Sequence, residues 1–269
     1  MTPPITRLQA YLRNSASERY HTVPLTPFTL FFHPTDRFPH FNYAIPDEPV
    51  TGDVQSQLHA LRQEYTRRGC QPRFEFIEEY APDLAAALWA AGFVEEGRQH
   101  FMICTPLSFK TPSTIQGVTI SVVRADAPLA DVQAYITVQR QGFDPTNTTP
   151  VTEEEAQGYH PTLETGTSFL ACLDRVPVAA GMLMNPLDGI TELAGVATLA
   201  AYRRRGIAAA LTAYALQTAF AQGVEIACLT AGDAAAGRVY EQAGFYPCAT
   251  MLAYHVPAEG SSIAVETDS

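Results

Sequence analysis

The second half of the chain alternates between segments with strand-like and helix-like spacing of hydrophobic residues. Short β-rich runs predict strands, and apolar residues three or four positions apart predict helices. The expected strands span 118–123, 168–173, 177–184, 190–198, 225–230 and 246–255, and the expected helices span 129–143, 153–160, 206–222 and 233–243. Asp-Arg and Asp-Gly turns join the three consecutive strands between 168 and 198. The pattern therefore predicts a mixed α/β domain over residues 117–256.

The first half of the chain repeats the end of this order. At an offset of 152 positions, residues 74–77 match 226–229, and an Ala-Gly-Phe run at 91–93 matches the same run at 243–245. Matches in the same order of elements predict an internal repeat. Chance similarity between two strand-helix-strand units is the alternative. We expect a degenerate related domain at 1–104, a linker rich in turn residues at 105–116, and a disordered tail at 257–269.

Composition narrows the class of protein. The chain has 269 residues, of which 46% are hydrophobic and 17% charged, so it fits one large or two ordinary globular domains rather than a disordered or fibrous chain. The formal net charge of -11 disfavours nucleic acid and anionic membranes as partners and favours amines. The 5 cysteines follow no CxxC spacing, and no signal peptide or membrane-spanning run is recognisable. We therefore expect a cytoplasmic protein, and a homodimer is left open.

The acidity is concentrated in the second half, yet that half holds a compact cationic spot. Residues 117–269 carry 7 basic and 16 acidic residues, and Arg203, Arg204 and Arg205 account for three of the basic ones. They follow the strand expected at 190–198 and precede the helix expected at 206–222. Unpaired backbone N–H groups and the positive end of the helix dipole make such a position a site for a diphosphate. Gly206 and Ala208 lack bulk, so phosphate oxygens can approach the backbone, and the arginines add charge-assisted hydrogen bonds.

This segment resembles the acyl-CoA signature of the GNAT superfamily of N-acetyltransferases. The signature is Gln/Arg-x-x-Gly-x-Gly/Ala, and Arg203, Gly206 and Ala208 match it. It follows a strand and opens a long helix, and the segment VYEQAGF at 239–245 is similar to the family's LYExxGF stretch. The alternative interpretation of the three arginines is a solvated basic turn. Such a turn would not need the preceding strand, the long helix or the segment at 239–245. The resemblance covers about 117–256 and implies a mixed, mostly antiparallel central sheet flanked by helices.

The resemblance also implies where acetyl-CoA binds. In the family the fourth strand of the domain splays away from the fifth, and the pantetheine arm pairs with its backbone, which here belongs to Val196, Ala197 and Thr198. An N–H in this stretch would stabilise the oxyanion of the tetrahedral intermediate. The diphosphate would lie on the turn that follows Arg203, against the amides of Arg204, Arg205, Gly206, Ile207, Ala208 and Ala209.

The resemblance also implies catalytic roles for individual residues. Tyr240 matches the tyrosine that protonates the departing CoA thiolate, and a phenol with a pKa of about 10 stays protonated at neutral pH. Packing on a core helix is the alternative role for Tyr240. Glu192 lies where some members place their general base, and a water relay would serve equally. Asp233 replaces an asparagine that often contacts pantetheine, and it is also well suited to cap the following helix.

The corresponding positions of the first half have decayed. With Gly52 matched to Gly206 at an offset of 154, Pro49 replaces Arg203, and at an offset of 152 Leu88 replaces Tyr240. We expect this half not to bind acetyl-CoA. Its aromatic residues between 28 and 43 either form its core or line an acceptor pocket.

We therefore predict an N-acetyltransferase that moves an acetyl group from acetyl-CoA to a primary amine by direct attack. The acceptor, a small molecule or a peptide, stays open. The first alternative is a catalytically silent acyl-CoA-binding or sensor module, and the second is an interaction protein that binds no acyl-CoA. We expect no metal, because the 7 histidines are scattered without ligand spacing.

Overall fold

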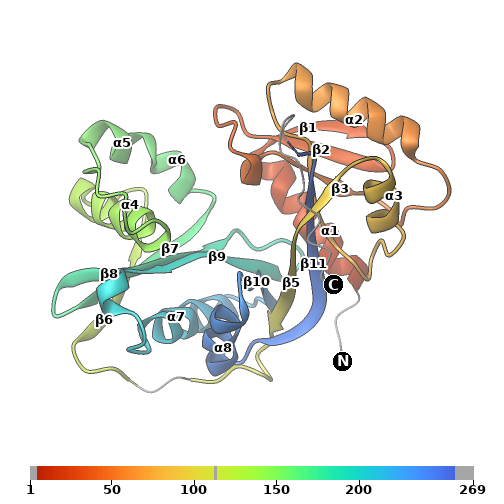
Figure 1. The fold of residues 1–269 in the computed structure, drawn as a ribbon. Coiled ribbons are helices and arrows are strands. Elements are labelled where there is room, and N and C mark those ends of the chain that lie inside the picture. The colour runs from red at the N-terminus through yellow and green to blue at the C-terminus, as the bar shows by residue number, and fades with distance from the viewer. Residues whose placement is uncertain (1–4, 112–113, 258–269) are drawn as a thin grey trace, which may run out of the picture. The chain divides into compact units, whose positions relative to one another are not determined.

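The computed structural model describes residues 5–111 and 114–257, which form two compact units (Figure 1). Unit 1 comprises the residues up to Gln99 together with those from Ala249 onward, and unit 2 comprises His100–Cys248. Each unit has a hydrophobic core of its own.

Unit 1 contains a sheet with helices on it. Its elements are α1 (Ile5–Arg19), β1 (His21–Leu25), β2 (Phe28–Phe32), the short helix η1 (Pro39–Phe41), β3 (Tyr43–Pro46), α2 (Gln55–Arg67), β4 (Arg73–Ile77), α3 (Leu84–Ala90), the start of β5 (Val94–Cys104) and the end of β11 (Tyr246–His255). The strand order is β1-β2-β3-β4-β11, and only the β3–β4 pair is parallel. The aromatic residues Phe28, Phe32 and Phe74 lie in the core beneath α2 and α3.

Unit 2 has the same kind of sheet, with helices on both faces. Its elements are the end of β5, β6 (Val118–Val123), α4 (Leu129–Phe143), α5 (Glu153–Gly158), α6 (His160–Leu163), β7 (Gly166–Leu173), β8 (Val176–Met184), β9 (Ile190–Thr198), η2 (Ala200–Tyr202), α7 (Ile207–Ala221), β10 (Ile226–Thr230), α8 (Ala234–Ala243) and the start of β11. The strand order is β5-β10-β9-β8-β7-β6, and only β9–β10 is parallel. In Figure 1, α4, α5 and α6 lie on one face of these strands, and α7 and α8 lie on the other.

The predicted mixed, mostly antiparallel sheet flanked by helices is confirmed. The hairpin turns expected after β7 and β8 are present, and both residues of each turn have positive φ: Asp174 and Arg175, then Asp188 and Gly189. The helix expected at 153–160 is divided into α5 and α6. Pro161 in the first turn of α6 explains the break, because proline has no backbone N–H with which to continue the preceding helix.

The internal repeat is also visible in the local structure. Gly92 and Gly244 each follow the end of a helix, and both glycines have a left-handed φ, of 79° and 104° respectively. The next residue then bonds back to the helix in the same way in both units, from Phe93 N to Leu88 O at 3.0 Å and from Phe245 N to Tyr240 O at 3.2 Å. The helix starts follow the same offset of 152, because α2 begins at Gln55 and α7 at Ile207. The match of Gly52 with Gly206 is therefore wrong, since Gly52 lies in the loop three residues before α2.

In each unit one strand pair joins segments that lie far apart in the sequence. Residues 251–255 of β11 pair antiparallel with β4 in unit 1, and residues 101–104 of β5 pair antiparallel with β10 in unit 2. The domain limits of 1–104 and 117–256 stay a prediction. Apart from Pro257, the predicted disordered tail lies outside the described residues.

Candidate active site

A cavity of about 730 Å³ in unit 2 collects most of the predicted site residues. Such a volume is within the range of small-molecule sites. Its lining includes Val196, Ala197, Thr198, Arg203, Arg204, Gly206, Ile207, Ala208, Ala209, Asp233 and Tyr240 from the sequence prediction. It also includes Gly142, Phe143, Tyr202 and Arg238, which the sequence analysis did not select. Arg205 and Glu192 are not among the residues that line it.

The wall formed by β9 is free of strand pairing on one side. The parallel ladder between β9 and β10 runs over three residue pairs and ends at Glu192 and Cys228, whereas β9 continues to Thr198. On its other side β9 stays paired with β8 as far as Thr198, with a bulge opposite residues 180–182. Gly195 in this bulge has a left-handed φ of 61°. The backbone of residues 193–198 thus lies beyond the ladder with β10, as an extended ligand that pairs with backbone would require.

The floor of the cavity is the start of α7. Its N-cap residue is Gly206, with a left-handed φ of 79° and no side-chain capping bond. The first backbone bond of the helix is from Ala210 N to Gly206 O, so the N–H groups of Ile207, Ala208 and Ala209 precede any intrahelical partner. Arg204 is also left-handed, with φ of 59°. Successive N–H groups around such residues make a concave site that favours anions.

The three consecutive arginines make different contacts. Arg203 donates from Nε to Thr198 O at 3.0 Å and from Nη2 to Gly142 O at 2.7 Å, so it ties β9 to the C-terminal turn of α4. Arg205 donates to Ala201 O at 3.2 Å, and its guanidinium lies 5.3 Å from the ring centroid of Tyr202. Arg204 has no hydrogen bond or ion pair to any residue that the structure describes. Only Arg204 of the three therefore presents an uncommitted cation to the cavity.

Arg238 of α8 supplies a second such cation. It is exposed, lines the cavity, and has no ion pair within the described part of the chain. The sequence signal for it was weak, because an arginine on a helix is most often a solvated surface residue. Its position two residues before Tyr240 on the same short helix is the feature that could have indicated it.

Tyr240 lies half-buried in the cavity wall with its ring 5.9 Å from that of Phe245. Burial, with a smaller contribution from the charge of Asp233, raises the pKa of Tyr240 to about 12. The hydroxyl therefore stays protonated well above neutral pH. Asp233 caps α8, because its Oδ1 accepts a hydrogen bond from Ala236 N at 2.7 Å. The capping role proposed for Asp233 is thus confirmed, while a contact with pantetheine stays a prediction.

Glu192 lies near the end of the β9–β10 ladder, opposite Cys228. Cys228 is completely buried, and burial together with the charge of Glu192 raises its pKa well above the ordinary range. This places the carboxylate near a buried thiol rather than in the cavity lining, and its role as a base stays a prediction.

Within residues 5–111 and 114–257, no group of three or more His, Cys, Asp or Glu side chains is arranged to hold a metal ion. No helix in this same part of the chain combines the length and the apolar composition needed to cross a membrane.

Fold and site together define a class: a mixed, mostly antiparallel sheet flanked by helices, with a cavity beside the part of β9 that lies beyond its ladder with β10. Residues 135–245 match the family model of the acetyltransferase (GNAT) family, so unit 2 carries a domain of this family. A comparison with curated protein sequences finds no match.

Solved structures extend the likeness to both units. A GCN5-related N-acetyltransferase from Kribbella flavida is 27% identical, with a TM-score of 0.78 over 94% of this chain and 96% of its own. A GCN5-related N-acetyltransferase from Sphaerobacter thermophilus is 16% identical, with a TM-score of 0.61 over 86% of this chain and 78% of its own. A tandem GNAT protein from the clavulanic acid biosynthesis pathway is 11% identical, with a TM-score of 0.59 over 86% and 79%. The N-terminal half therefore also has a GNAT-like fold.

Proposed function

We propose that the protein transfers an acetyl group from acetyl-CoA to a primary amine, with the cavity of unit 2 as its active site. The observation that carries this proposal is the meeting of three features in one cavity: unpaired β9 backbone, an uncapped start of α7, and a protonated tyrosine. Acyl transfer needs a place for the diphosphate, alignment of the thioester, and a proton for the leaving thiolate. The start of α7 offers a place for the diphosphate, the β9 backbone can align the thioester, and Tyr240 can supply the proton.

In this proposal the diphosphate lies on the amides of α7 between Arg204 and Arg238. The pantetheine arm pairs with the backbone of Val196, Ala197 and Thr198. An N–H in this stretch stabilises the oxyanion. The amine attacks the thioester carbon directly, and the C–S bond breaks as Tyr240 donates its proton to sulfur. A thiol has a pKa of about 8.5, so a phenol with a higher pKa gives up its proton only as thiolate charge develops.

The acceptor amine must be deprotonated before it can react. A primary amine with a lysine-like pKa of about 10.4 must lose a proton before it attacks. Glu192 or a water relay takes this proton. The acceptor is a small-molecule or peptide amine, and the net charge of -11 favours a cationic one. The 5 cysteines are free thiols, which supports a cytoplasmic location.

Tyr240→Phe separates an enzyme from a silent acyl-CoA-binding module. The substitution removes the hydroxyl and keeps the ring contact with Phe245. Turnover in an acetyl-CoA-consumption assay across amine classes should fall by about 10²-fold or more, with acetyl-CoA affinity within about twofold of wild type. Binding of acetyl-CoA with no turnover by the wild-type protein on any amine would favour the silent module.

A further inference from the structure

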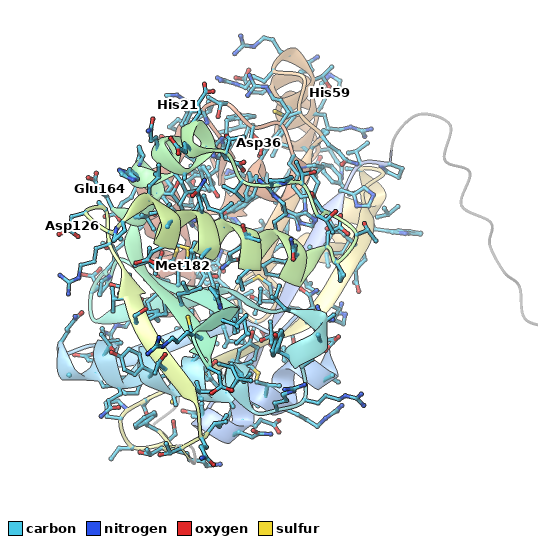
Figure 2. All side chains as sticks on the ribbon, turned by 90° about the vertical axis from the view of Figure 1, so that its left-hand side faces the viewer. His21, Asp36, His59, Asp126, Glu164 and Met182 are labelled. Carbon is cyan, nitrogen blue, oxygen red and sulfur yellow. The ribbon has the colours of Figure 1, made fainter. Side chains whose placement is uncertain are left out.

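The side chain of Gln139, on α4, holds one peptide of the β9 bulge. Its Nε2 donates to Gly195 O at 2.6 Å and to the hydroxyl of Tyr135 at 3.2 Å. The fit is close, since a Cβ added at Gly195 would lie 3.1 Å from that same nitrogen. In Figure 2 α4 crosses the strands of unit 2 beside the labelled Met182 of β8, consistent with its packing on β8 and β9.

This hydrogen bond fixes the direction of a second backbone group. A trans peptide is planar, and its C=O and N–H point in opposite directions. Because the Gly195 carbonyl points to Gln139 on α4, the N–H of Val196 points away from α4. Val196 lines the cavity and belongs to the part of β9 that lies beyond the ladder with β10. The left-handed φ of Gly195 makes this rotation of the peptide possible.

We propose that Gln139 is a positioning residue for acyl transfer, which orients the Val196 N–H towards the thioester oxygen by holding the Gly195 carbonyl. The inference rests on the proposed function, because it requires acetyl-CoA to lie along β9. A donor aimed in advance at the developing oxyanion needs no reorganisation during the reaction, and such donors are worth large factors in rate.

Gln139 also joins this peptide to the helices on the same face. Tyr135 is completely buried, and the ring centroid of Tyr159, which follows α5, lies 5.9 Å from that of Tyr135. Burial raises the pKa of both phenols, so Tyr135 stays protonated over the neutral range and its hydroxyl keeps the bond from Gln139. Hydrogen bonds therefore run from Gly195 through Gln139 to Tyr135, and the buried ring of Tyr135 packs against that of Tyr159.

The test uses the thioester carbonyl as its own reporter. Acetyl-CoA labelled with ¹³C at this carbonyl is bound to wild type, Q139L and Q139E, and the carbonyl stretch is recorded by isotope-edited infrared spectroscopy. Both variants remove the donor, and Q139E keeps the length of the side chain. Gln133→Leu is the matched control, because Gln133 lies on the same helix and donates to a different carbonyl, Val151 O, at 3.0 Å.

We expect the carbonyl stretch at lower frequency in wild type and Q133L than in Q139L and Q139E, with acetyl-CoA dissociation constants within about threefold. With an acceptor amine, kcat of the Gln139 variants should fall by about 10- to 100-fold while KM for acetyl-CoA stays near wild type. Equal stretching frequencies in all four proteins, or losses shared by Q133L, would overturn the inference and leave the proposed function intact. Failure of wild type to bind acetyl-CoA would instead refute the proposed function itself.

Discussion

Alanine substitutions of Arg203, Arg204 and Arg205 should have three different effects, although the residues are adjacent. Arg203→Ala removes two charge-assisted hydrogen bonds, of 3.0 and 2.7 Å, between the end of β9 and the last turn of α4. Because the guanidinium is partly exposed, we expect a loss of about 1–3 kcal/mol in the free energy of unfolding. That loss corresponds to a decrease of roughly 2–10 °C in melting temperature.

Arg204→Ala should leave the stability of the protein unchanged and weaken the binding of acetyl-CoA. Its side chain has no partner in the described part of the chain, so the free energy of unfolding should stay within about 0.5 kcal/mol. If Arg204 binds a phosphate group of acetyl-CoA, its loss should raise the dissociation constant by about 3- to 10-fold and weaken the salt dependence of binding. Arg238→Ala should behave in the same way.

Arg205→Ala is the internal control. It loses one exposed hydrogen bond and the contact with the Tyr202 ring, and Arg205 itself is not among the residues that line the cavity. We expect less than about 1 kcal/mol in stability and less than a twofold change in acetyl-CoA affinity. The assays are chemical unfolding and isothermal calorimetry on all four variants. The reasoning is refuted if Arg203→Ala keeps full stability yet weakens acetyl-CoA binding as much as Arg204→Ala.

Two further predictions concern α8. Since the pKa of Tyr240 is about 12, its protonated fraction falls only as pH rises through that value, so kcat/KM should not decline between pH of about 8 and 10. A decline with an apparent pKa near 10 that disappears in Tyr240→Phe would contradict this assignment. Asp233→Ala removes the capping bond to Ala236 N and should lower the free energy of unfolding by about 1 kcal/mol, measured by urea titration. Asp233→Asn keeps an accepting oxygen and should stay within a few tenths of a kcal/mol; an equal loss in both variants would show that the cap is not the cause.

The local parts of the fold could be predicted from the sequence. Apolar spacing located β9, α7, β10 and α8, and the shift from an apolar strand to Gly206 and an alanine-rich helix located the anion-binding turn. These features depend on neighbours within a few residues, so a single sequence contains the necessary information. The placement of Tyr240 and the α7 turn in one cavity came from the family resemblance rather than from periodicity.

Long-range pairing could not be predicted in the same way. Alternation identifies a strand but not its partner, so nothing indicated that residues 101–104 pair with β10 while residues 251–255 pair with β4. The direction of individual side chains could not be predicted from the sequence either. Three adjacent arginines look alike in sequence, yet one bonds across 61 positions to Gly142 O and another stacks on Tyr202. The bond from Gln139 to Gly195 spans 56 positions and has no local signature.

A calorimetric titration of the wild-type protein with acetyl-CoA tests the central claim most directly. The account predicts saturable binding of one acetyl-CoA per chain, because only unit 2 keeps Arg203, Gly206 and Tyr240, whereas Leu88 replaces the tyrosine in unit 1. The absence of binding would contradict the proposed active site. Binding of two molecules per chain would show that the N-terminal unit has kept a site of its own.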